Sequence, residues 1–412
     1  MTTTLMRTAE FPLPGHPDKL ADTIADQLVH EARRRDPRAR VGVAVAIHRN
    51  TVFIDGRIAC PNSCRIGLRG AVARVLVTDG AIAPTRAAKG KLNLIADLRR
   101  ERLTDVERAS RDSADDQSIV TGYACSLPGT RGVPLEHAFA RSFARRLHDG
   151  RVARQHPLGP DGKVIVHIEE RDAGRRFRVT DASVSIQHQR SWDPVAARRT
   201  VAQALRTTID EFALSVPGFD GSSEPTLAVN GVADFVLAGS HGDNGLTGKK
   251  LVSDFYGPRV PIGGGALSGK DFLSVDRAGA LIARAVAVAA VDRLGSRECT
   301  VTLAISPGDR EFRIVRVEAD NAIPVDVARL HTLVDLRIAA TEDWPERNGF
   351  ADPSAPPGIP DLSRWGHFGR ERSTARPPAP LPTPQQVISL TDSVTEITCS
   401  GSAYSSSSGV SP

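Results

Sequence analysis

The stretch GGGALSGKD, residues 263–271, places three glycines ahead of a lysine and so bears on which phosphate-binding fold the chain has. Gly264 to Lys270 satisfies the first seven positions of a P-loop, but the eighth residue is Asp271, where a P-loop has serine or threonine. The preceding VPIGGG is short and contains a proline, so it does not predict the strand that leads into a P-loop. Two readings remain: a different kind of phosphate site, or a glycine-rich turn that happens to hold a lysine.

Length and composition bound the class of protein. The 412 residues allow two to four domains, and 40% hydrophobic with 25% charged residues is typical of a soluble globular chain. The longest apolar run, residues 279–290, is interrupted by Arg284 and falls short of the roughly 18 to 20 residues of a membrane span. The net charge of +5 permits an anionic partner. Because the basic residues are scattered and only 5% of residues are aromatic, we expect a phosphate-bearing small molecule and no nucleic acid.

The N-terminal residues and the cysteines indicate the compartment. Residues 1–19 lack the basic segment, apolar stretch and cleavage site of a secretory signal. Five cysteines in so long a chain do not form a disulfide framework, and Cys60-x3-Cys64 has no second metal-binding half. We therefore expect a protein of the reducing cytoplasm.

Lysine is scarce in this chain. Of 53 lysines and arginines, only seven are lysines, and five of these lie in the short motifs HPDK, PDGK, TGKK and SGKD. Lysine differs from arginine in carrying a compact, strongly hydrated point charge on a flexible stem. Either these positions require such a charge, or chance and base composition placed the lysines there.

Three stretches of about a hundred residues each mix strands and helices, as hydrophobic periodicity indicates. Their recurrence predicts an α+β fold in which related units pack sheets around a shared centre. Residues 98–115 are charged and weakly patterned, which predicts a mobile loop or short helix and allows a lid. The predicted elements are helices at 17–35, 63–77, 135–148, 194–216 and 275–294, and strands at 41–47, 51–58, 164–170, 176–187, 300–306 and 311–318, with a further strand at Phe235.

Five short motifs hold side chains suited to a polyphosphate. His16 and Asp18 open the first helix, where unpaired N–H groups and the helix dipole favour an anion. Each motif alone is more often structural, but together they supply four lysines and a histidine for phosphates. They also supply Asp18 and Asp276 as ligands for Mg²⁺, which prefers carboxylates plus phosphate oxygens. The other members are Asp161 and Lys163 in PDGK, predicted as a turn before a strand; Asp243, Lys249 and Lys250 in GDNGLTGKK; Lys270 in SGKD; and Asp116 with Gln117 in SADDQS.

The motifs, in order, resemble those of the S-adenosylmethionine synthetases (methionine adenosyltransferases). The resemblance implies three related mixed α/β domains with pseudo-threefold symmetry, in a homodimer or dimer of dimers with active sites between subunits. We expect the domains at 1–101, 102–228 and 229–372, followed by a Pro/Ser/Thr-rich, disordered tail at 373–412. The matching stretches are GHPDK (15–19), DDQS (115–118), GYA (122–124), PDGK (160–163), SIQH (185–188), GDNGLTGKK (242–250), DFYG (254–257), GGGALSGKD (263–271), VDR (275–277) and GHFGRE (366–371).

The resemblance also implies a reaction. A sulfur nucleophile, methionine in the family, attacks C5′ of ATP; tripolyphosphate leaves and is then cleaved to pyrophosphate and phosphate. Such a displacement needs cations and metal at the departing oxygens rather than a strong base. By position, His16 would stabilise the departing oxygen; Asp18 and Asp276 would hold Mg²⁺; Lys163, Lys249, Lys250 and Lys270 would bind phosphates; Asp116, Phe235 and Asp243 would border adenosine and the acceptor; and Glu10 and Asp161 would support them.

The chain departs from the family mainly at the acceptor. Ala44 stands where the family has a glutamate associated with a monovalent cation, which argues against a K⁺ requirement. Arg57 replaces the glutamate that holds the methionine ammonium, and Arg102 aligns with a glutamine of the same pocket. At about 4 Å and an effective dielectric near 20, this reversal turns an attraction of roughly 4 kcal/mol into a repulsion of similar size before relaxation. Among the phosphate ligands, Lys249 replaces an arginine and Ser274 replaces a lysine.

Several functions fit these departures. The first is adenosyl transfer from ATP to a sulfur-containing small molecule, either methionine in a rearranged pocket or a more anionic acceptor. The second is a non-catalytic partner that regulates an active relative. The third is a tripolyphosphatase or ATP hydrolase, for which Arg57 would be tolerated because water needs no ammonium pocket.

Overall fold

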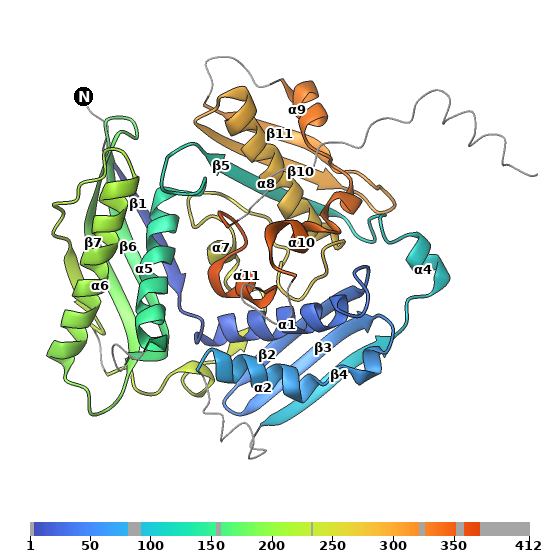
Figure 1. Ribbon diagram of the computed structural model, residues 1–412, viewed down its shortest axis with the longest axis horizontal. Helices are drawn as coiled ribbons and strands as arrows, with labels where there is room; N and C mark the ends of the chain where they lie inside the picture. Colours follow the sequence, from blue (N-terminus) through green and yellow to red (C-terminus); the bar gives the residue numbers. More distant parts are fainter. Residues whose placement is uncertain are drawn as a thin grey trace, which may run out of the picture. The chain divides into compact units, whose positions relative to one another are not determined.

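The computed structural model describes residues 4–80, 92–153, 158–231, 234–320, 326–351 and 358–370; the predicted tail at 373–412 lies outside them. Within these residues, three sheets, each with helices on one face, surround a central group of helices (Figure 1). This arrangement agrees with the predicted α+β fold of three related units. None of the helices in this part of the chain is long and apolar enough to cross a membrane.

The N-terminal sheet shows how the sequence builds each unit. Along β2, buried Val41, Val43 and Val45 alternate with exposed residues, so one face packs against helices and the other stays open. Helix α1 begins after His16, with Pro17 at its first position and Asp18 in its first turn. The sheet has the order β4-β3-β2-β9, with β2 at Arg40–His48, β3 at Thr51–Ala59, β4 at Asn93–Glu101 and β9 at Gly245–Leu246; α1 spans Pro17–Arg33 and α2 spans Leu68–Thr78.

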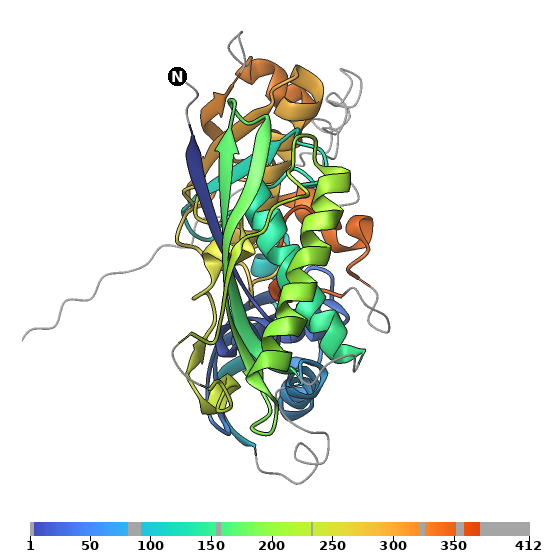
Figure 2. The same ribbon diagram turned by 90° about the vertical axis from the view of Figure 1, so that its left-hand side faces the viewer.

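The central and C-terminal sheets repeat this plan. Figure 2 shows helices α5 and α6 on one face of the central sheet. In the C-terminal sheet, helix α8 covers one face. The central sheet has the order β1-β6-β7-β8 (Leu5–Pro12, Leu158–Arg171, Arg176–His188, Thr226–Val229) with α5 at Leu135–Val152 and α6 at Pro194–Ser215; the C-terminal sheet has the order β11-β10-β5 (Arg313–Ala319, Glu298–Ile305, Ser118–Cys125) with α8 at Val275–Leu294.

Each sheet also contains a strand from a different third of the chain. β1, from the N-terminal third, pairs antiparallel with β6 of the central sheet. β5 (Ser118–Cys125) pairs with β10 of the C-terminal sheet, and β9 (Gly245–Leu246) pairs with β2 of the N-terminal sheet. The three units are therefore interlocked, and segments far apart in sequence meet where the exchanged strands begin and end.

Three local predictions were wrong. PDGK is not a turn but lies within β6, where a register irregularity between Leu158 and Gly162 accommodates its proline and glycine. Phe235 is in irregular structure rather than a strand. The helix predicted from residue 63 begins at Leu68, after a 3-10 turn at Ser63–Arg65.

For the charged stretch at 98–115, the predicted short helix is confirmed, but the strand at its start was not predicted. Its first residues are the end of β4, and Asp105–Ala109 forms the short helix α4. β4 is the edge strand of its sheet and carries charges on its open side, which is why its hydrophobic pattern is weak.

Six short helices after residue 238 in the described part of the chain were not predicted. Figure 1 shows α7, α10 and α11 beside α1 in the centre of the three units. The Trp344 ring stacks on Phe272 and on Phe350, with interplanar angles of 17° and 13°. The bounds are α7 Leu251–Asp254, η2 Gly239–His241, α9 Val327–Leu333, η3 Ile338–Thr341, α10 Trp344–Asn348 and α11 Pro360–Trp365.

Candidate functional site

His16 caps helix α1 and is held as a neutral ring. Its Nδ1 accepts a hydrogen bond from the backbone N–H of Asp18 at 3.2 Å, so the ring proton resides on Nε2. Burial, together with the charges of Lys250 and Lys163, lowers the pKa of His16 to about 4. Near neutral pH, His16 therefore offers an uncharged N–H donor from the start of α1.

Asp18 lies close to both lysines of the GDNGLTGKK loop. Lys250 Nζ lies 2.8 Å from Asp18 Oδ2, and Lys249 Nζ lies 3.8 Å from Oδ1. Burial raises the pKa of Asp18, but hydrogen bonds from Lys250 and from the Leu246 N–H outweigh it, and the net effect lowers the pKa. The structure thus brings one carboxylate and two lysines to the beginning of α1, as the motifs predicted.

A stripe of carboxylates on α1 positions both lysine-bearing loops. Asp18, Asp22 and Asp26 are four residues apart and so share one helix face. Asp22 and Asp26 were not singled out from the sequence, although their four-residue spacing after Asp18 is visible there. Their carboxylates accept from backbone N–H groups of the two loops: Leu246 to Asp18 at 3.0 Å, Gly248 to Asp22 at 2.8 Å and Gly269 to Asp26 at 3.0 Å.

Fully buried cations lie behind this stripe. Lys19 Nζ bonds Asp254 at 2.5 Å and lies 3.5 Å from Asp22, so this lysine is internal and does not face a ligand. Burial raises the pKa of Asp22 to about 8. Arg277 bonds both oxygens of Asp26, at 2.9 and 3.0 Å. These buried pairs fix the position of α1 relative to the two loops. Their role is therefore to hold the site in place, not to bind the ligand.

The central sheet adds Glu10, Asp161 and Lys163. Lys163 Nζ pairs with Glu10 at 3.0 Å across β6 and β1. Asp161 Oδ2 accepts from the Gly239 N–H at 2.6 Å, while its buried Oδ1 has no hydrogen-bond partner among the described residues. Burial, with contributions from nearby Asp243 and Asp18, raises the pKa of Asp161 to about 6. These groups therefore share one electrostatic environment with the start of α1.

The GGGALSGKD loop carries a second lysine–carboxylate pair. Lys270 bonds Asp276 at the start of α8, and Ser118 Oγ donates to the other oxygen of Asp276 at 2.7 Å. A Cβ at Gly265 would lie 2.3 Å from Asp276 Oδ1, so the backbone approach requires glycine. Asp271 instead faces inward, accepting from the Val41 N–H at 2.8 Å. The residue that breaks the P-loop pattern is thus a structural anchor of the loop.

Arg57 is neutralised by two carboxylates that the sequence analysis did not single out. Its Nε bonds Glu101 at 2.5 Å, and its Nη1 lies 2.6 Å from Glu107 of α4. The hydrogen bond from Arg57 lowers the pKa of Glu107 to about 2, with a contribution from the Thr104 N–H. Arg102 is exposed at the end of β4, and it is the neighbouring Glu101 that reaches Arg57.

Strand register places Arg57 near Lys270. Arg57 is opposite Gly42 on β2, and Gly42 forms a bridge with Lys270 on its other side. Two strand spacings separate their backbones by about 10 Å. Ala44, two residues along β2, is opposite Asp55 and offers no ligand atom beyond its backbone.

The remaining predicted residues have few contacts that fix a role. Asp116 accepts from the Gln117 N–H at 2.8 Å, and Asp243 from the Asn244 N–H at 2.7 Å. The Phe235 N–H donates to His188 Nε2 at 3.3 Å. Ser274 is the N-cap residue of α8, but its side chain makes no cap hydrogen bond.

The donors for a metal are two carboxylates. Within the described ranges, no three His, Cys, Asp or Glu side chains form a complete metal site. Asp18 and Asp276 nevertheless fit Mg²⁺, since Mg²⁺ bound with a polyphosphate commonly takes one or two carboxylates and fills its other positions with phosphate oxygens and water. Each carboxylate bonds a lysine that could turn to a phosphate instead.

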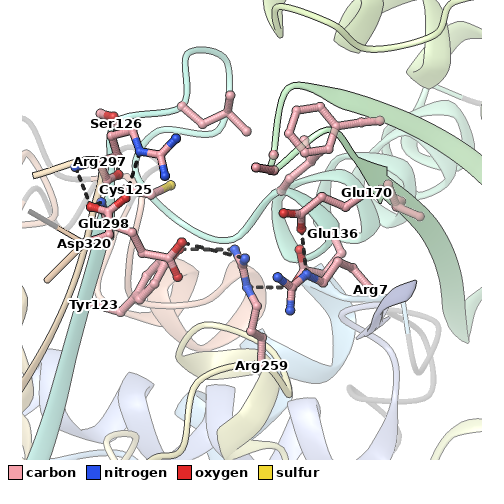
Figure 3. Close-up of a pocket in the computed structure, with 16 residues that line it drawn as sticks. Arg7, Tyr123, Cys125, Ser126, Glu136, Glu170, Arg259, Arg297, Glu298 and Asp320 are labelled. Carbon is pink, nitrogen blue, oxygen red and sulfur yellow. Dashed lines mark hydrogen bonds and ion pairs between the residues drawn. The ribbon is translucent and has the colours of Figure 1, made fainter. Parts of the chain in front are cut away.

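A separate cavity of about 170 Å³ contains none of the predicted site residues. It lies between the central and C-terminal units, and its charged side chains point toward one another (Figure 3). Arg259 Nε lies 3.2 Å from buried Glu136, and Arg7 bonds Glu170 at 2.7 Å. Because these charged side chains pair with each other, we assign the cavity to the contact between the two units and not to the candidate site.

Comparisons with known proteins agree with the motifs. The N-terminal, central and C-terminal domain families of S-adenosylmethionine synthetase match residues 4–81, 111–233 and 237–375. S-adenosylmethionine synthase 1 of Rhodospirillum rubrum is 32% identical over 376 residues, covering 88% of this chain and 93% of the relative.

Two further relatives give the same result. The S-adenosylmethionine synthase of Myxococcus xanthus is 32% identical and covers 80% of this chain and 82% of its own. That of Paramagnetospirillum magneticum is 30% identical, with 88% and 92% covered. The chain belongs to the S-adenosylmethionine synthetase family.

Proposed function

We propose that this protein is an ATP-dependent S-adenosyltransferase that uses methionine as acceptor. The observation that carries the proposal is the group at the start of α1, where neutral His16, Asp18, Lys249 and Lys250 meet. These groups are suited to a polyphosphate leaving from a carbon atom, because they supply hydrogen-bond donors and positive charge without a strong base.

The bond changes follow from this arrangement. A lone pair of the methionine sulfur forms a bond to C5′ of ATP, the C5′–O5′ bond breaks, and its electron pair leaves on tripolyphosphate. The His16 Nε2–H is the donor for the departing oxygen, and its low pKa keeps the ring neutral. The products are a sulfonium and tripolyphosphate, and water then cleaves one P–O bond of tripolyphosphate to give pyrophosphate and phosphate.

The lysines and carboxylates bind the phosphate chain. Lys249 and Lys250 come from the GDNGLTGKK loop beside the start of α1, Lys270 comes from the GGGALSGKD loop, and Lys163 comes from β6. Asp18 and Asp276 would hold Mg²⁺, which offsets the negative charge of the phosphates when bound. Lys250 and Lys270 now neutralise these two carboxylates, so nucleotide and metal would redistribute existing contacts.

A homodimer is part of the proposal. Each sheet exposes large apolar side chains on the face away from its helices, and such faces are typical of subunit contacts. The exposed residues include Met6 (55%) of β1, Phe53 (37%) and Ile95 (49%) of β3 and β4, and Ile119 (68%) and Val315 (63%) of β5 and β11.

The test is to incubate the protein with ATP, Mg²⁺ and methionine and to detect products by mass spectrometry. We expect S-adenosylmethionine, and a loss of roughly 100-fold or more in rate for His16→Asn. Asparagine is also a good helix N-cap, so this change removes the ring donor while leaving α1 capped. His331→Asn, at an exposed position on α9, is the matched control.

The alternatives give different results. Phosphate release without any adenosylated product would indicate an ATP hydrolase or tripolyphosphatase. Absence of Mg²⁺-ATP binding in calorimetry would indicate a non-catalytic partner.

A further inference from the structure

The open face of the N-terminal sheet holds an ion-pair cluster around Arg57. Its Nε and Nη1 are taken by carboxylates from β4 and α4, at 2.5 and 2.6 Å. The two carboxylates outweigh the single positive charge of the guanidinium, so this position is unfavourable for an anionic ligand. Arg57 is therefore engaged within the protein and does not present an empty anion site.

The two carboxylates differ in what they still offer. Glu107 accepts from Arg57 through Oε1 and from the Thr104 N–H and hydroxyl through Oε2, both at 3.0 Å, so both oxygens are occupied. Glu101 receives Arg57 on Oε1, while its Oε2 receives, among the described residues, a hydrogen bond from Arg99 alone, at 3.4 Å. The Arg99 side chain is 75% exposed and free to move away. Glu101 thus keeps an accessible oxygen, with 35% of its side chain exposed.

The surrounding charge favours a cation. Asp55 and Asp97 are adjacent in the register of β3 and β4, on the same side of the sheet as Arg57. Like charges directly opposite one another are unfavourable unless a positive group lies near them. On this side, three arginines (Arg40, Arg57, Arg99) accompany five carboxylates (Asp55, Asp97, Glu101, Glu107, Asp115).

From this geometry we infer that Glu101 binds the ammonium group of the acceptor, that Arg57 positions Glu101, and that Glu107 neutralises Arg57. The inference rests on the proposed adenosyl transfer and specifies its acceptor as a cationic amino compound rather than an anionic thioether. Register places the backbone of Arg57 about two strand spacings, roughly 10 Å, from that of Lys270, and Glu101 is on the next strand, from which its side chain reaches Arg57. An amino-acid acceptor lying beside the phosphates is of suitable length to reach it.

Three acceptors distinguish the contribution of the ammonium group from that of the carboxylate. They are methionine, 3-(methylthio)propylamine, which lacks the carboxylate, and 4-(methylthio)butanoate, which lacks the ammonium. Initial rates of sulfonium formation from ATP are measured for each acceptor with the parent, Glu101→Gln, Arg57→Lys and Arg57→Gln. Glu211→Gln is the matched control, because Glu211 pairs with Arg146 on the exposed side of α6.

We expect the parent to use methionine and the amine in preference to the acid. Glu101→Gln should raise KM for methionine and for the amine roughly tenfold, with kcat changed less than about twofold and KM for the acid unaffected. Arg57→Gln should shift KM in the same direction by a smaller factor. Arg57→Lys should give KM values between those of Arg57→Gln and the parent, since lysine keeps the charge but cannot bond both carboxylates as a fork. Glu211→Gln should match the parent.

Two results overturn the inference alone: preference of the parent for the acid, or an unchanged ratio of KM values for methionine and the acid in Glu101→Gln. Failure of the proposed function is distinguishable, because the parent would then form no sulfonium from any of the three acceptors.

Discussion

Replacing Arg57 by glutamate introduces the residue that the resemblance to the family implies at this position, yet the structure predicts that the change destabilises this protein. The change removes two ion pairs, at 2.5 and 2.6 Å, and sets a third carboxylate between Glu101 and Glu107. Because the side chains are 21 to 35% exposed, each lost pair is worth only about 0.2–1 kcal/mol.

The new repulsions add to this loss. At about 4 Å, each costs between roughly 1 kcal/mol in water and 4 kcal/mol at a dielectric of 20, and relaxation of exposed side chains favours the lower value. The sum is about 2–4 kcal/mol. Urea unfolding followed by circular dichroism should therefore show a lower midpoint for Arg57→Glu, and a smaller decrease for Arg57→Gln, which removes attraction without adding repulsion.

The charge-swapped pair Arg57→Glu with Glu101→Arg isolates the interaction. A double-mutant cycle should return at least half of the lost stability, because the swap recreates an ion pair between β3 and β4. The reasoning is refuted if Arg57→Glu is as stable as the parent and binds methionine more tightly.

Three further predictions concern the buried groups and cofactors. Asp26→Ala leaves the guanidinium of Arg277 buried without its main partner, so unfolding free energy should fall by about 3–5 kcal/mol; a fall below 1 kcal/mol would show that Arg277 finds another partner. Asp161→Asn should gain stability relative to the parent as pH rises from about 4 through 6, because the raised pKa of Asp161 means that the folded parent must ionise a buried carboxyl; thermal melts across pH 4–8 should show the difference growing to at most about 3 kcal/mol and then levelling. Because Ala44 provides no side-chain ligand, replacing NaCl by KCl at equal ionic strength should change the rate of adenosyl transfer less than twofold, and a strong stimulation by K⁺ would contradict this.

The sequence alone determined those helices and strands for which the cap residues and the hydrophobic periodicity indicate the same element. Helix α1 has Pro17 after its cap and an apolar stripe, β2 has strict alternation, and α8 follows the GGGALSGKD loop, so each was predicted to within a few residues. The order and spacing of the short motifs were specific enough to indicate the family and most of the candidate residues around α1.

Only the tertiary structure decided which residues meet. Asp26 and Arg277 are 251 positions apart, and Arg57 and Glu101 are 44 apart, and no periodicity within either segment encodes its partner. The exchanged strands β1, β5 and β9 were missed for the same reason, because each pairs with a strand from a distant part of the chain and is stabilised by the sheet that it joins. From the sequence, Arg57 reads as a reversed charge in an acceptor pocket; in the fold it is one member of a compensated cluster.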